Sequence, residues 1–66
     1  MPIIRVEMLP GRTVEQKREF AHAVTDLASD VLGCGKEAIA VVFDEVAPHN
    51  WANGGLLESD KAAGHT

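Results

Sequence analysis

The alternation of apolar and polar residues over positions 2–9 predicts a β-strand. Its two faces carry different residues, with Ile4, Val6 and Met8 on one and Ile3, Arg5, Glu7 and Leu9 on the other. Pro10-Gly11 follows as a turn pair and ends the strand. Arg12, in the loop after that turn, is by itself most simply a solvated arginine.

A helix is predicted to begin at Thr13 and to run to about Leu32. Thr13 and Gln16 have the spacing of a capping box, in which each side chain binds a free backbone amide of the first turn. Spacings of three and four predict one apolar stripe, made of Phe20, Val24, Leu27, Ala28 and Val31. Gly33 is placed to end the helix in a left-handed conformation.

The run from Ala38 to Val46 is nearly all apolar, which predicts a second strand buried on both faces. A strand, a helix and a strand in this order favour a right-handed crossover with parallel strands. Residues 49–55 are rich in turn formers and predict a short hairpin, and Asp44 and Glu45 are interpreted as a solvated strand end. The small and polar residues 58–66 predict a frayed tail.

Sixty-six residues predict a single α/β domain spanning 1–66. A chain of this size buries only about 60% of its unfolded surface. Cys34 is the only cysteine, so no disulfide within the chain compensates, and no Cys/His spacing predicts a metal site. Because a two-stranded sheet with one helix leaves a sheet face uncovered, we expect neighbouring subunits to cover it and to contribute to a shared site.

Charge and hydropathy exclude several classes of partner. The formal net charge is −4, which argues against nucleic acid, and no apolar run approaches the length of a membrane span. The chain shows neither a charged-then-apolar leader nor a pair of cysteines, so we predict a cytoplasmic protein with no membrane partner.

The candidate for chemistry is Pro2, directly behind the initiator methionine. If Met1 is removed, Pro2 carries a secondary amine, and an ordinary α-amino group titrates near ~7.7–8.0. Burial or a nearby cation lowers that value toward the range that suits a general base. A proline tolerated at the first position of a strand is the structural alternative. Trp51 either fills a subunit contact or walls a pocket.

These residues together resemble the 4-oxalocrotonate (2-hydroxymuconate) tautomerase family. The resemblance rests on Met1-Pro2-Ile3-Ile4, on Leu9 to Thr13 with Glu15-Gln16-Lys17, and on Glu45, Trp51 and Asn53-Gly54-Gly55. It implies β-α-β subunits with a short C-terminal hairpin that assemble as a homohexamer or, with a paralogue, as a heterohexamer. It also implies a cofactor-independent keto–enol isomerase acting on a small carboxylate substrate.

The resemblance assigns roles to four positions. Pro2 is the general base that shuttles a proton, and Arg12 holds a substrate carboxylate and favours the uncharged amine. Trp51 and Leu9 line the pocket. Apart from the resemblance, the turn residues Asn50 and Asn53 near Trp51 are expected to offer neutral hydrogen-bond donors. Two alternatives remain open: a hydratase or dehalogenase acting on an unsaturated acid with the same residues, and a non-catalytic assembly subunit.

One position departs from the family pattern. Tautomerases of this kind carry a second arginine on the second long strand, and a gap-free alignment places Ala40 there. A methyl group supplies no charged, bidentate donor. We therefore expect poor activity on dicarboxylates and better activity on monoacids with an apolar tail.

Overall fold

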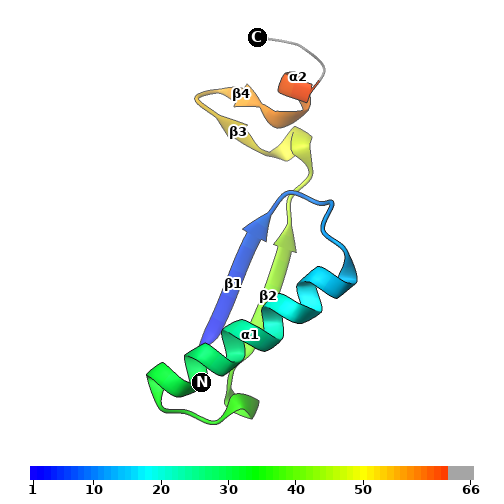
Figure 1. Cartoon of the computed structure of the whole chain (residues 1–66). Coiled ribbons are helices and arrows are strands. Elements are labelled where there is room, and N and C mark those ends of the chain that lie inside the picture. Colours follow the sequence, from blue (N-terminus) through cyan, green and yellow to red (C-terminus); the bar gives the residue numbers. More distant parts are fainter. Residues whose placement is uncertain (63–66) are drawn as a thin grey trace.

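Two parallel strands form the centre of the fold, as Figure 1 shows. The computed structural model of the chain describes residues 1–62. Strand β1 (Ile3–Met8) pairs with β2 (Ala40–Glu45) in a register that runs from Ile3 opposite Ala40 to Met8 opposite Glu45. The predicted β-α-β architecture with parallel strands is confirmed. Both strands are shorter than predicted, because Pro2 has no amide to donate and a 3-10 helix takes Lys36–Ala38.

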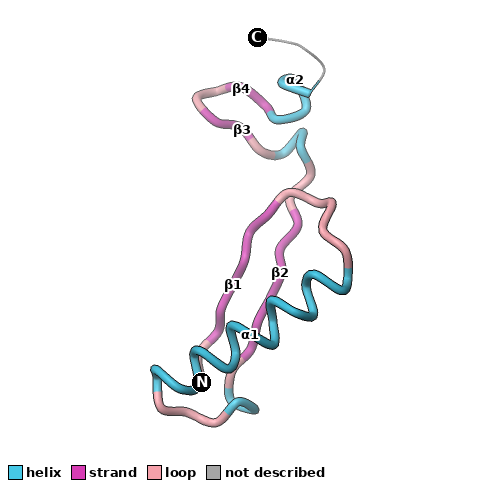
Figure 2. The backbone as a smooth tube through the Cα atoms, viewed as in Figure 1, coloured by secondary structure: helices cyan, strands magenta, loops and turns pink. Residues whose placement is uncertain are grey.

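Helix α1 (Val14–Leu32) connects the two strands along one side of the sheet (Figure 2). Its start matches the prediction: the Thr13 amide donates to Gln16 Oε1 at 2.9 Å, and the Gln16 amide donates to Thr13 Oγ1 at 3.1 Å. Its end also matches, because Gly33 adopts φ 70° and its amide closes the last turn on the Ser29 carbonyl. Local sequence therefore determines both ends of the helix.

The contact between helix and sheet is narrower than the predicted apolar stripe. Ala28 is buried, Ala21 and Val24 are half-buried, and Phe20 meets Phe43 edge to face at 6.0 Å between ring centroids. Leu27 and Val31, which belong to the same apolar stripe, are 62% and 71% exposed in the single chain. Neighbouring strands lie only about 5 Å apart, so a two-stranded sheet is narrow. It covers the part of the helix face that is centred on small alanines, and the larger apolar side chains extend past the edge of the sheet.

The chain continues beyond β2 into a separate small unit, seen at the far end of the strands from the N-terminus in Figure 1. It contains a 3-10 helix (Pro48–Asn50), the hairpin of β3 (Ala52–Asn53) and β4 (Leu56–Leu57), and the helix α2 (Glu58–Ala62). Gly54 and Gly55 form the two-residue turn with φ 60° and 83°, as a hairpin turn with two left-handed residues requires. The predicted frayed tail is wrong for 58–62, and 63–66 lie outside the described residues.

The chain does not enclose a core by itself. Its Cα radius of gyration is 15.6 Å, whereas a compact domain of this length has about 11 Å. Within the described residues Ala28 is the one buried apolar residue. Large apolar side chains stay exposed on both faces: Met1, Ile3, Val14, Phe20, Leu27, Val31, Leu32 and Val42. Burying them requires other chains, because an apolar surface of this extent is unusual on a monomer.

Candidate functional site

Pro2 is held at the start of the sheet. Its carbonyl accepts a hydrogen bond from the Ala40 amide at 3.1 Å, which fixes the residue immediately before β1. Pro2 is half-buried, whereas Met1 in front of it is 96% exposed. The nitrogen of Pro2 therefore lies where the chain enters the sheet. Only the exposed residue Met1 precedes it.

Arg12, Leu9 and Trp51 lie at the opposite end of the strands. Parallel strands end at the same edge of a sheet, so the loop after β1 and the segment after β2 begin side by side (Figure 1). Leu9 and Trp51 are half-buried and Arg12 is exposed. The six residues of β1 span roughly 20 Å at ~3.3 Å per residue, so one chain does not bring Pro2 and Arg12 together.

Arg12 borders a hollow of about 250 Å³ between α1 and the sheet. Its lining combines the apolar residues Val6, Met8, Phe20 and Phe43 with the polar residues Arg12, Gln16 and Lys17. Within residues 1–62 no carboxylate lies at ion-pair distance from Arg12. An unpaired guanidinium beside apolar side chains suits a carboxylate attached to an apolar body.

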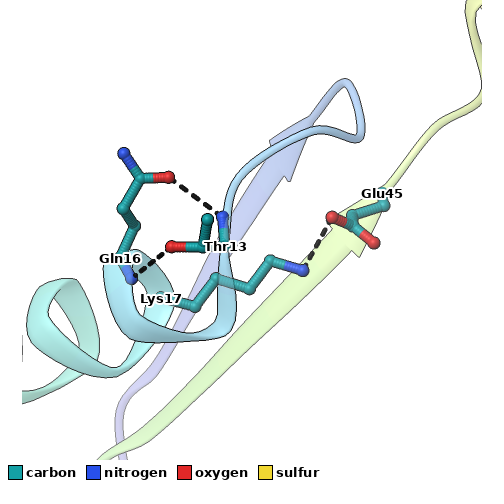
Figure 3. Close-up of polar contacts among 4 residues, drawn as sticks. All are labelled: Thr13, Gln16, Lys17 and Glu45. Carbon is teal, nitrogen blue, oxygen red and sulfur yellow. Dashed lines mark hydrogen bonds and ion pairs between the residues drawn. The ribbon is translucent and has the colours of Figure 1, made fainter.

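Lys17 and Glu45 join the two segments that carry Arg12 and Trp51. Figure 3 shows Lys17 reaching from the first turn of α1 to Glu45 at the end of β2, with Nζ 2.6 Å from Oε2. The same turn holds the capping box of Thr13 and Gln16. Sequence reasoning missed this pair and assigned Glu45 to a solvated strand end. The partners are 28 residues apart, and only the meeting of the parallel strand ends brings them together.

A second hollow, of about 290 Å³, lies beside Trp51. Val46 and Ala52 supply its apolar lining, and Glu7 and Asn50 its polar lining. Asn53 lies two residues after Trp51 in β3, where its Nδ2 donates to Glu58 Oε1 at 2.9 Å. The Asn53 donor is thus engaged within the chain, whereas Asn50 directly adjoins the Trp51 hollow.

The described part of the chain contains no cluster of side chains suited to bind a metal ion. Over residues 1–62 no three His, Cys, Asp or Glu side chains gather closely enough to ligate one. Over the same range no helix is both long and apolar enough to span a bilayer.

The chain matches known proteins over almost all of its length. A family model described as "Tautomerase enzyme" matches residues 2–61. A protein named a probable tautomerase in Bacillus cereus is 43% identical over 61 residues, which is 92% of this chain and 100% of that protein.

Solved structures give the same result. The crystal structure of a 4-oxalocrotonate tautomerase homologue matches with a TM-score of 0.87 and 42% identity, covering 91% of this chain and 95% of that one. A heterohexamer 4-oxalocrotonate tautomerase from Chloroflexus aurantiacus J-10-fl matches with a TM-score of 0.83 and 32% identity, covering 91% of this chain and 97% of that one.

Proposed function

The chain belongs to the tautomerase family, and we propose that it transfers a proton on a small enol or 2-keto acid with Pro2 as the general base. Removal of Met1 is part of the proposal, because only a terminal proline carries a basic amine. The base removes a proton from the substrate hydroxyl or carbon and returns it to another atom of the same conjugated system. No cofactor enters such a step, since the proton never leaves the pair of substrate and amine.

The position of Pro2 is the observation that carries this proposal. The hydrogen bond from the Ala40 amide holds its carbonyl at the end of the parallel ladder. The ring nitrogen is then fixed by the backbone instead of by a flexible side chain.

The separation of Pro2 from Arg12 implies a site shared between chains. A strand length of roughly 20 Å lies between them in one chain. The exposed apolar side chains supply the surface on which further copies assemble. We propose a homohexamer in which Arg12, Leu9 and Trp51 of one subunit face Pro2 of another. Arg12 then binds the substrate carboxylate and Trp51 covers its apolar part.

Ala40 narrows the substrate class. It pairs with Ile3 directly after Pro2, and its side chain is exposed on the sheet face that turns away from α1. A dicarboxylate would bring a second negative charge close to Ala40, whose methyl group supplies no cation to pair with it. Leaving a charge without a partner is expensive in a partly dehydrated site. Monoacids with an apolar or aromatic tail are therefore the proposed substrates.

The test is ketonisation of phenylenolpyruvate and of 2-hydroxymuconate, followed spectroscopically for the natural protein and for Pro2→Ala. We expect faster turnover of the aromatic monoacid, and a fall in kcat for Pro2→Ala, in which the primary amine of a terminal alanine replaces the secondary amine of the proline ring. Equal rates for the two proteins would refute the assignment of Pro2.

A non-catalytic assembly subunit is the second candidate. The observation that favours it is the extent of exposed apolar surface, which serves assembly whether or not Pro2 is active. Absence of turnover with every enol acid, together with stable mixed hexamers formed with an active paralogue, would establish this role.

A further inference from the structure

The ion pair of Lys17 and Glu45 lies between the two loops that hold the substrate-binding candidates. Lys17 follows Arg12 by five residues, in the first turn of α1, and Glu45 is the last residue of β2 before the segment leading to Trp51. The Nζ–Oε2 distance is 2.6 Å, and the side chains are only 24% and 37% exposed. No other ion pair of the described residues joins α1 to the C-terminal end of a strand.

We propose that Lys17 and Glu45 are positioning residues that hold the Arg12 loop in register with the end of β2. This inference rests on the proposed role of Arg12 in binding the substrate carboxylate. Lys17 lines the same hollow as Arg12, so the pair fixes one wall of that hollow. The guanidinium itself is on an exposed loop with no ion-pair partner within residues 1–62, and its placement depends on the backbone that carries it.

The pair also sets the charge of the hollow. Glu45 neutralises the Lys17 ammonium, which leaves Arg12 as the cation without a carboxylate partner among the residues that line the hollow. One available cation matches one carboxylate, as the preference for monoacids requires. The two effects of the pair are separable, because loss of positioning raises KM in Glu45→Gln whereas release of the Lys17 charge lowers it.

Two hydrogen-bonded backbone amides, one on each side of the ion pair, report whether the pair holds the two segments together. The Thr13 amide donates to Gln16 Oε1 at 2.9 Å on the Arg12 side. The Val46 amide donates to the Met8 carbonyl at 2.8 Å on the Glu45 side. If the ion pair holds the two segments together, its loss speeds hydrogen exchange at both amides. An ion pair without a positioning role leaves both amides unchanged.

The experiment compares Lys17→Met, Glu45→Gln and the charge-swapped double variant Lys17→Glu/Glu45→Lys. Arg18→Met is the matched control, because Arg18 lies on the same helix and pairs with Glu15 on an exposed face. We expect KM for phenylenolpyruvate to rise up to about 5-fold in both single variants, the factor for a partly exposed pair worth about 1 kcal/mol. The kcat stays nearly unchanged, the swap restores KM, and Arg18→Met changes neither.

Several outcomes overturn the inference. An unchanged KM and unchanged exchange at Thr13 and Val46 in both single variants would do so. A fall in melting temperature or in assembly mass that accounts for the whole effect would show a merely structural pair. A lower KM in Glu45→Gln would show that releasing the Lys17 charge outweighs any loss of loop placement, and would overturn the positioning role.

Failure of the proposed function gives a different result. If the natural protein turns over no enol acid, the tautomerase proposal fails, but exchange at Thr13 and Val46 still decides whether the ion pair holds the two segments. Faster exchange in the single variants, restored in the swap, supports positioning. Unchanged exchange refutes it.

Discussion

Replacing Ala40 with arginine tests how the site selects its substrate. Ala40 is the first residue of β2, and its amide is bound to the Pro2 carbonyl at 3.1 Å. The backbone therefore fixes the point from which a new side chain starts, directly beside the proposed base. Because the Ala40 side chain is exposed within the chain, Ala40→Arg needs no rearrangement of the contact between α1 and the sheet.

The expected gain follows from the strength of charged hydrogen bonds. A hydrogen bond to a charged group contributes about 1.5–3 kcal/mol. Each 1.36 kcal/mol is a tenfold change in rate, so kcat/KM for 2-hydroxymuconate should rise roughly 10- to 150-fold in Ala40→Arg. A monoacid has no second carboxylate to bind, and its kcat/KM should change little.

Spectroscopic ketonisation assays on both substrates measure the effect as a ratio of kcat/KM values. Ala40→Gln is the control, because it adds a side chain with neutral donors and no charge. A natural protein that already handles the diacid as well as its best monoacid would refute the reasoning. So would an Ala40→Arg variant that gains equally on both substrates.

Three further predictions concern binding, assembly and stability. Arg12→Ala should raise KM for carboxylates more than it lowers kcat, whereas Arg18→Ala should leave both unchanged; an unaltered KM for Arg12→Ala would contradict its role. Leu27→Asp should yield a smaller species than Leu27→Ile by light scattering, because Leu27 is 62% exposed and apolar. The hydrogen bond and charge of Lys36 lower the pKa of Asp26 below its usual 3.8, so this pair stabilises the fold above that value and the benefit is lost as pH falls below it. Melting curves should therefore show Asp26→Asn less stable than the natural chain at pH 7 and equal to it in strong acid; a difference that persists in acid would contradict the pair's contribution.

Local patterns predicted much of the fold. The alternation in β1 sorted its residues into two faces, because a strand places every second residue on one face. The capping box at Thr13 and the left-handed Gly33 fixed both ends of α1, since each depends on residues within one turn. The order of strand, helix and strand was enough for the parallel pairing.

Those local patterns did not predict the contacts between residues that are far apart in the sequence. A periodicity of three and four identifies the apolar side of α1, but it does not tell whether the covering surface is the same chain or another, so the exposure of Leu27 and Val31 in the single chain was not predicted. The ion pair of Lys17 and Glu45 joins segments 28 residues apart. The helix at 58–62 begins where the Glu58 amide binds the Trp51 carbonyl at 2.8 Å, a contact that its own sequence does not reveal.

The candidate site was predicted as a set of residues shared between subunits, without the position of each residue along the strands. The order and spacing of Pro2, Leu9, Arg12 and Trp51 identified the family, because they match residue by residue. Their distribution over opposite ends of the strands follows from the parallel register, which is a property of the folded chain. Whether one subunit holds a whole site is thus a question that the fold answers and the motif does not.

Removal of Met1 is the most direct test of the amine at Pro2. The measurement compares ketonisation of phenylenolpyruvate by two forms of the same chain, each verified by intact mass, one beginning at Met1 and one at Pro2. We predict that activity belongs to the form beginning at Pro2, because only there is the nitrogen a basic secondary amine. Equal activity in the form that retains Met1 would contradict the role of Pro2 as the general base.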